Sequence, residues 1–411
     1  SDDPVPHRVL RGLAAGVLIV ILIGTGCGRQ VAPAVEPVTI SFAAPNYARD
    51  SYARLIEEFE AAYPHITVNM MSQGGPGASM EMSCTTCDVV RVGLADLTSE
   101  RLAEFRPLDD LIQAGTSASD TAFPFSDLVE GTAEAIRLAG RQLGIPAGIN
   151  PVVVYYNTER FAAAGIRIPE NRWTLDEFAL TAQTAQSPAG AVDYAYGYCA
   201  RPELGDAAIF TYLLGGQLVD NLVEPTRPTL DSPANEDALA WYTGLRRIYQ
   251  ANPPPEDVQA QMGDITRAIW MGRCGLWLGF YADRARFAGF LSDRGRAVPG
   301  MVPLPAGKES FGVAALDVYA ILRNSQKATA AWQWIKFLID QPEAATPLLA
   351  PRTSQLASQT YAALVDKETL RIARNLPDRL FIWDSSLETS AIGGTVAAYL
   401  QAVEQVANGL D

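Results

Sequence analysis

This chain has too few histidines to support most histidine-dependent chemistry. His7 and His65 are the two histidines among 411 residues. We expect His7 to be removed with an N-terminal signal, and the local context of His65 is that of a structural residue. One remaining histidine leaves almost no scope for a His-based metal site. Ser-His-Asp or Cys-His catalysis would depend on His65 alone.

Four of the five cysteines lie after residue 80 and could form disulfides, bind a metal or remain as thiols. Cys84 and Cys87 have the C-x-x-C spacing, in CTTC. A redox C-x-x-C normally opens a helix after a strand, which lowers the thiolate pKa, whereas Cys87 enters the strand-like run DVVRV. Together with Cys199 and Cys274, these cysteines allow two disulfides (84 with 87, 199 with 274), a four-cysteine zinc site, or free buried thiols. We favour the disulfides.

Other motifs for catalysis or nucleotide binding are incomplete. The glycine-rich stretch GGPGAS (Gly74–Ser79) has the spacing of neither a dinucleotide-binding turn nor a phosphate-binding loop. In PAGKES, Glu309 follows Lys308 where a phosphate-binding loop needs Ser or Thr to reach magnesium. No two of the 46 acidic residues stand in a context that assigns acid and base roles for glycoside hydrolysis. We therefore expect a protein that is not an enzyme and needs no cofactor or metal.

Length and charge narrow the class of protein further. The chain is 48% hydrophobic and 19% charged, and its 411 residues exceed one ordinary domain, so two lobes are expected. The 32 basic and 46 acidic residues give a net charge of −14. Nucleic-acid binding depends on clustered positive charge, so we expect no nucleic-acid partner.

The N-terminal 26 residues have the organisation of an export signal. Two arginines precede the apolar run Leu13–Ile23, and small residues then lead to Cys27. The run is too short to span a membrane, which takes roughly 20 apolar residues. Its ending resembles a bacterial lipoprotein signal, which implies that residues 1–26 are cleaved and that Cys27 is lipidated. Residues 27–37 would then tether an extracytoplasmic domain to the cell membrane, in a compartment that permits disulfides.

Strand and helix patterns alternate along the rest of the chain. In VTISFAAP (Val38–Pro45) apolar residues alternate with Thr and Ser, which predicts a strand. In residues 51–63 apolar residues recur at i, i+3, i+4, i+7 and i+11, which predicts an amphipathic helix that ends at Pro64. ITVNMM and CDVVRVG predict further strands, and KATAAWQWIKFLIDQP predicts another helix. This alternation indicates an α/β fold with helices packed on a sheet.

The stretch Gly144–Ala185 carries a set of pieces in a distinctive order. It has IP before a turn, a strand ending in YYN, a short helix ending in AAG, and WT-x-DEF. FEAAYPHITV, LLGGQLVDN, IWMGRCGLWLGFY and APRTSQLAS occur at matching places elsewhere. In order and spacing these pieces resemble the family 1 extracellular solute-binding proteins of ABC importers, such as maltodextrin-binding proteins.

This resemblance implies a two-lobed periplasmic-binding-protein-like fold of type II, with a ligand cleft between two α/β lobes that close about a hinge. It places residues 38–146 and 300–345 in the N-terminal lobe, and residues 147–299 and 346–411 in the C-terminal lobe. The protein would act as a monomer that captures a solute and delivers it to ABC transporter permease subunits.

The resemblance also implies a set of ligand contacts, since sugars need aromatic faces and polar hydrogen-bonding groups. The implied contacts are Asn46, Tyr47, Asp96, Asn150, Tyr155, Phe210, Tyr212, Tyr281 and Trp383. We expect Trp277 to be a core residue rather than a ligand contact. Asp317 stands where relatives tend to have small residues. It could be a polar contact of the cleft or a structural acid whose hydrogen bonds are satisfied within the protein.

A sugar or oligosaccharide is the expected solute, and two alternatives stay open. The same receptor could bind a polyamine, a phosphodiester or a peptide, and the net charge of −14 suits a cationic solute. The chain could instead be an exported glycan hydrolase, which requires a carboxylate pair in the cleft.

Overall fold

The computed structural model describes residues 36–73, 84, 86–97, 101–114, 123–169, 172–188, 191, 194–222, 225–293, 295–382 and 393–409. The chain divides into two units, Ser1–Glu36 and Pro37–Asp411, and every element below belongs to the second unit. The predicted signal, Cys27, most of the predicted tether, the glycine-rich stretch and Trp383 lie outside the described residues.

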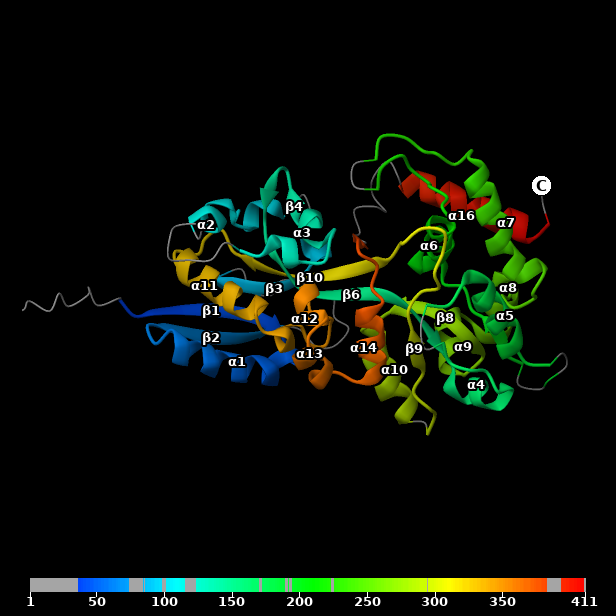
Figure 1. The fold of residues 1–411 in the computed structure, drawn as a ribbon, viewed down its shortest axis with the longest axis horizontal. Coiled ribbons are helices and arrows are strands. Elements are labelled where there is room, and N and C mark those ends of the chain that lie inside the picture. Colours follow the sequence, from blue (N-terminus) through cyan, green and yellow to red (C-terminus); the bar gives the residue numbers. More distant parts are fainter. Residues whose placement is uncertain are drawn as a thin grey trace, which may run out of the picture. The chain divides into compact units, whose positions relative to one another are not determined.

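One mixed sheet runs through the second unit (Figure 1). Its main path, in spatial order, is β2 (Ile66–Gln73), β1 (Val38–Pro45), β3 (Val89–Gly93), β10 (Val313–Ile321), β6 (Ile145–Tyr156), β8 (Cys274–Phe280) and β7 (Tyr196–Tyr198). β11 (Phe381–Ile382) pairs with β10, and β9 (Gly300–Val302) pairs with β6. β1 is parallel to both of its neighbours, while β10 is antiparallel to β3 and β6. A separate hairpin joins β4 (Arg137–Leu138) and β5 (Arg141–Gln142).

Helices surround this sheet. The described helices are α1 (Arg49–Ala62), α2 (Asp109–Ala114), α3 (Thr132–Ala135), α4 (Thr158–Ala164), α5 (Leu175–Ala185), α6 (Asp206–Leu213), α7 (Pro233–Arg247), α8 (Pro255–Met262), α9 (Ile265–Trp270), α10 (Asp283–Ser292), α11 (Ala328–Ile339), α12 (Thr353–Leu356), α13 (Gln359–Leu364), α14 (Lys367–Arg374) and α16 (Gly393–Ala407). Within the described ranges, none of them has the length and apolar character needed to cross a membrane.

β6 is the strand that joins the two halves of the sheet. Residues Ile145–Pro151 pair with β10, whereas Val152–Tyr156 pair with β8 and β9. The ladder partners therefore change in the middle of this strand. The pairing favours a lobe boundary near Pro151, a few residues after the predicted one at 146/147. It also places Gly300–Val302 with the second half of the sheet, whereas the predicted boundary at 299/300 puts these residues in the first lobe. The lobe boundaries stay a prediction.

Aromatic packing holds α1 and α11 on the first half of the sheet. Phe42 of β1 packs edge-on against Tyr52 of α1 and Trp334 of α11, with ring centroids 4.9 and 5.6 Å apart. Phe59, two turns further along the apolar stripe of α1, lies 4.9 Å from Trp334. The helix predicted from the apolar spacing of residues 51–63 is thus present as α1, and that spacing places Tyr52 and Phe59 in the core.

The second half of the sheet has its own core, on which α5 and α6 pack. A capping box starts α5: Thr174 Oγ1 accepts from Glu177 N at 3.1 Å, and the Glu177 carboxylate accepts from Thr174 N at 2.7 Å. The WT-x-DEF piece therefore forms the start of α5, and its Thr and Glu supply the cap. Phe178 of α5 then packs against Phe210 of α6, with ring centroids 5.2 Å apart.

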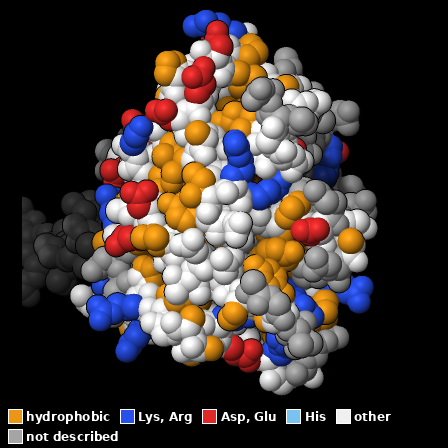
Figure 2. All heavy atoms as spheres, turned by 90° about the vertical axis from the view of Figure 1, so that its right-hand side faces the viewer, with side chains coloured by type: hydrophobic (Ala, Val, Ile, Leu, Met, Phe, Trp, Pro, Cys, Tyr) orange, Lys and Arg blue, Asp and Glu red, His pale blue; other side chains and the backbone are white. Residues whose placement is uncertain are grey.

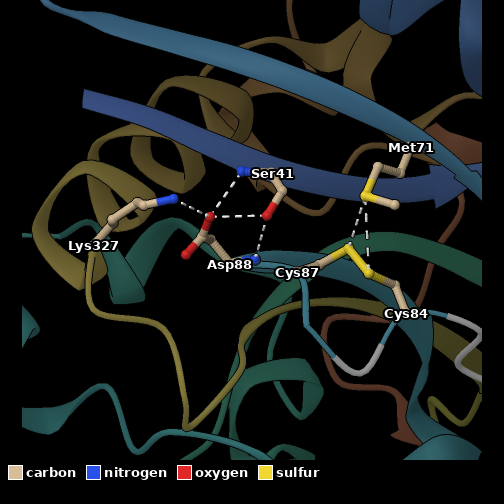
Figure 3. The surroundings of a disulfide bond; sticks show 6 residues. All are labelled: Ser41, Met71, Cys84, Cys87, Asp88 and Lys327. Carbon is tan, nitrogen blue, oxygen red and sulfur yellow. Dashed lines mark hydrogen bonds and ion pairs between the residues drawn. A yellow bond between two sulfur atoms is a disulfide. The ribbon is translucent and has the colours of Figure 1, made fainter. Parts of the chain in front are cut away.

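Both cysteine pairs are disulfide-bonded, one in each half of the sheet. Cys199 and Cys274 join the ends of β7 and β8 across 75 residues of chain. Cys84 and Cys87 form the other bond, and Met71 of β2 directs its sulfur toward it, 3.5 Å from Cys87 Sγ (Figure 3). Of the three arrangements that the sequence allowed, the structure holds the disulfides.

Asp88 follows this disulfide and ties β1, β3 and the start of α11 together. Its carboxylate accepts from Ser41 N and Ser41 Oγ at 2.8 Å and from Ser325 Oγ at 2.7 Å, and Lys327 Nζ lies 3.4 Å away (Figure 3). Burial acts to raise the pKa of Asp88. The hydrogen bonds and the charge of Lys327 outweigh burial and hold the pKa below its ordinary value of 3.8.

Asp88→Asn should lower the free energy of unfolding at pH 7 by about 1–3 kcal/mol, because an amide cannot replace the charge-assisted acceptors. The pKa is lower in the folded state, so the ionised carboxylate stabilises the fold above the unfolded-state pKa. This contribution is lost as the pH falls through the folded-state pKa, and the two proteins should converge there. Urea unfolding at several pH values measures this, with Asp231→Asn at an exposed carboxylate as control. A difference that stayed constant down to acid pH would contradict the assignment.

Candidate functional site

The carboxyl ends of β1 and β3 meet at one edge of the sheet. The strands are parallel, with Phe42 opposite Val89 and Ala43 opposite Val90. Short 3-10 turns follow each strand, Asn46–Ala48 after β1 and Leu94–Asp96 after β3. The strand ends thus bring Asn46, Tyr47 and Asp96 to the edge where open α/β sheets bind ligands. The side chain of Asn46 is exposed, and that of Tyr47 is not among those described.

Asp96 is the carboxylate of this edge. Its side chain is 19% exposed and lies 3.7 Å from Arg101 Nη1. Burial raises the pKa of Asp96, the charge of Arg101 opposes this, and the nearby charge of Asp317 raises the pKa further. Asp96 therefore shares its surroundings with a second carboxylate, from β10.

Asn150 and Tyr281 meet at the middle of β6, where its ladder partners change. Asn150 Oδ1 accepts from Ala282 N at 2.9 Å, and Tyr281 N donates to Pro151 O at 2.8 Å. These bonds join β6 to the end of β8 and the start of α10. The half-buried Tyr281 ring lies beside α14, with 3.0 Å between its hydroxyl and Thr369 Oγ1.

Charged residues that the sequence analysis missed surround Tyr281. Arg284 lies 2.8 Å from the carboxylate of Asp366 and 2.9 Å from that of Glu368, which joins α10 to α14. Arg201 lies 3.6 Å from Asp283, whose pKa is raised by burial against the charge of Arg201. The run YADR directly after an apolar strand was a sequence signal that could have indicated Asp283 and Arg284. Arg201 and α14 come from distant segments, and no sequence signal linked them to Tyr281.

Two predicted aromatic contacts, Tyr155 and Phe210, are core residues, and a third, Tyr212, is partly buried. Tyr155 is fully buried and stacks on Trp277 with 5.8 Å between ring centroids. Its hydroxyl group donates a hydrogen bond to the backbone carbonyls of Phe280 and Tyr281, which lie 2.8 and 2.9 Å away. Phe210 is also fully buried, in the core of the second half. Tyr212 stacks on Phe311 at 4.9 Å and its hydroxyl accepts from Leu218 N. Buried rings present no surface to a ligand, so we do not carry Tyr155 and Phe210 forward.

Two cavities among the described residues of the second unit lie beside the predicted contacts rather than among them. One, of about 280 Å³, borders the middle of β6, the segment Pro303–Val313 and the end of α14. A larger open groove of about 1350 Å³ lies among α4, α9 and α10. The linings include none of the predicted contacts whose side chains are described. The described residues also contain no group of His, Cys, Asp and Glu that could hold a metal ion.

The surface viewed in Figure 2 carries acidic, basic and apolar side chains interspersed with one another. Its described part therefore lacks the continuous basic patch that a phosphate backbone requires.

Comparison with known proteins identifies the family. The family model described as bacterial extracellular solute-binding protein matches residues 46–345. A binding protein of Brucella abortus (strain 2308) is 24% identical over 344 residues, covering 80% of this chain and 77% of that protein. A protein of Brucella suis biovar 1 (strain 1330) matches with the same figures.

Solved structures show the same fold at low sequence identity. The cyclic α-maltosyl-1,6-maltose binding protein from Arthrobacter globiformis has a TM-score of 0.66 and 15% identity, covering 91% of this chain and 95% of that one. The sugar-binding protein MalE from Xanthomonas citri has a TM-score of 0.63 and 19% identity, covering 90% and 97%. UgpB from Mycobacterium tuberculosis, in complex with glycerophosphocholine, has a TM-score of 0.61 and 18% identity, covering 91% and 93%. Because the family model matches most of the chain and the two-lobed fold is shared, the chain belongs to the bacterial extracellular solute-binding proteins.

Proposed function

We propose that this protein is the extracytoplasmic receptor of an ABC importer, which captures a sugar or oligosaccharide between its lobes and delivers it to the permease subunits. The family supports the receptor role. Neighbouring structures named as binding cyclic maltosyl-maltose and other sugars support the ligand class.

One observation carries the ligand class. Two polar clusters belong to the two halves of the sheet: Asn46 and Asp96 at the carboxyl edge of β1 and β3, and Tyr281 with its charged neighbours at the end of β8. The first offers acceptors for hydroxyl groups, and the second an aromatic ring beside charges. A sugar needs both, because its C–H faces lie on rings while its hydroxyls need polar partners.

A phosphodiester is the second candidate, because the neighbour from M. tuberculosis was solved with glycerophosphocholine. Arg201 and Arg284 already pair with Asp283, Asp366 and Glu368, and these carboxylates offset the positive charge that would attract a phosphate. These pairings favour the sugar.

A thermal-shift screen of the purified chain should reveal the ligand class. A ligand at about 100 times its Kd adds about 2.7 kcal/mol of stability, a shift of a few degrees for lobes of this size. The panel holds maltose, maltotriose, D-tagatose, glycerophosphocholine, spermidine and an amino-acid mixture. We expect a sugar to raise Tm without being consumed. A response to another class alone would discard the sugar, and turnover of the bound sugar would support the hydrolase.

Tyr281→Ala should raise the Kd for the sugar at least tenfold, about 1.4 kcal/mol, because the ring is lost. Tyr281→Phe is the matched control, since it keeps the ring and removes only the hydrogen bond to Thr369, and we expect it to bind within about threefold of wild type. Isothermal titration calorimetry measures both. Unchanged affinity of the alanine variant would remove Tyr281 from the site.

We further propose that the receptor is a monomer anchored through a lipid on Cys27. Cys27→Ser should then release the protein from the membrane fraction and abolish incorporation of radiolabelled palmitate in cells that express the full gene. Membrane retention of the serine variant would contradict the anchor, while the binding proposal would stand.

A further inference from the structure

We infer that Asp317 is a further ligand contact of the proposed site, which accepts a hydrogen bond from a sugar hydroxyl beside Asp96, and that Arg91 is its positioning residue. This inference rests on the proposed function.

Asp317 has a glycine opposite it on each neighbouring strand. On β10 it stands opposite Gly93 of β3 on one side and Gly148 of β6 on the other. Residues directly opposite in a ladder point to the same face, so Gly93 leaves space next to the carboxylate, whereas Leu348 fills the space beside Gly148. Asp96 reaches into this space, with its Oδ2 3.6 Å from the position that a Cβ on Gly93 would occupy.

One oxygen of Asp317 is held in place and the other is available. Arg91 Nε donates to Asp317 Oδ2 at 2.9 Å, and the Asp317 side chain keeps 15% of its surface exposed. Oδ1 has no hydrogen-bond partner among the described residues. A carboxylate fixed on one oxygen offers a second acceptor without the entropy cost of ordering a mobile side chain.

Arg91 can act as a rigid support because its guanidinium is fully buried and bonded on every nitrogen. Nη1 donates to Tyr52 Oη and Ala344 O at 3.0 Å and to Thr346 O at 3.2 Å, while Nη2 donates to Ala345 O at 3.0 Å. These carbonyls belong to the segment that leads from α11 back toward Leu349, whose backbone exchanges two 2.9 Å hydrogen bonds with Ile149 of β6. A ligand on Asp317 would therefore contact the carboxylate that Arg91 holds, and Arg91 in turn anchors this segment.

The chemistry of the pair selects hydrogen-bond donors. Asp317 and Asp96 place two carboxylates near one another, and Arg101, which pairs with Asp96, is also shared with Glu104. Two neighbouring acceptors match two adjacent hydroxyls of a sugar ring, each of which donates one proton. A ligand that presents only acceptors or a phosphate at this position would be repelled by both.

Asp317→Asn tests the contact. The amide oxygen can still accept from Arg91 Nε, but the second position becomes a donor and can no longer accept from a hydroxyl. We expect the Kd for the panel sugar that binds the wild type (maltose, maltotriose or D-tagatose) to rise at least tenfold in isothermal titration calorimetry. Tyr52→Phe is the control, because it removes a hydrogen bond from Arg91 without touching Asp317. It should lower Tm while leaving Kd within about threefold.

Monodeoxy analogues of the bound sugar separate a contact from a structural role. The analogue that lacks the hydroxyl facing Asp317 should bind the wild type more weakly, yet bind Asp317→Asn no more weakly than the parent sugar does. Equal affinities of Asp317→Asn and the wild type for the parent sugar would overturn the inference and leave the proposed function standing. Equal losses for Asp317→Asn and Tyr52→Phe would also overturn it. A wild-type chain that binds no panel sugar would overturn the proposed function and this inference together.

Discussion

β6 contributes its first half to a ladder with β10 and its second half to ladders with β8 and β9. Because a strand is stiff along its hydrogen-bonded length, this one segment sets how the two halves of the sheet continue into each other. Asn150 and Pro151 stand where the partners change, and both use polar backbone or side-chain atoms to hold the end of β8. Tyr281 is thereby fixed at the junction.

A second constraint is the buried charge of Arg91. A guanidinium removed from water is tolerated only when its donors are satisfied, and here a carboxylate, a tyrosine hydroxyl and three successive carbonyls satisfy them. The bonds to the carbonyls also hold the segment after α11 against the sheet, and the bond from Nε orients Asp317. Core stability and the geometry of the proposed site thus share one set of atoms.

Local patterns predicted the first half of the fold well. Alternation in Val38–Pro45 corresponds to β1, the apolar spacing of residues 51–63 corresponds to α1, and KATAAWQWIKFLI contains α11. These elements are amphipathic, so their period is visible in the chain. The site was predicted in part: the polar residues after β1 and β3 do share an edge, because parallel strands bring their carboxyl ends together.

The aromatic contacts were harder to predict, for a physical reason. β6 is buried along almost its whole length, so its sequence lacks the alternation that separates a core ring such as Tyr155 from an accessible one. The sequence by itself determined the α/β class, the strands and helices with clear periods and the number of cysteines available for bonding. Only the tertiary structure decided that Tyr155 is packed, that Arg201 and α14 surround Tyr281, and that Asp317 meets Arg91 across 226 residues. Burial and long-range charge pairing depend on which segments come together in space, and the local periodicity of the sequence does not indicate which segments these are.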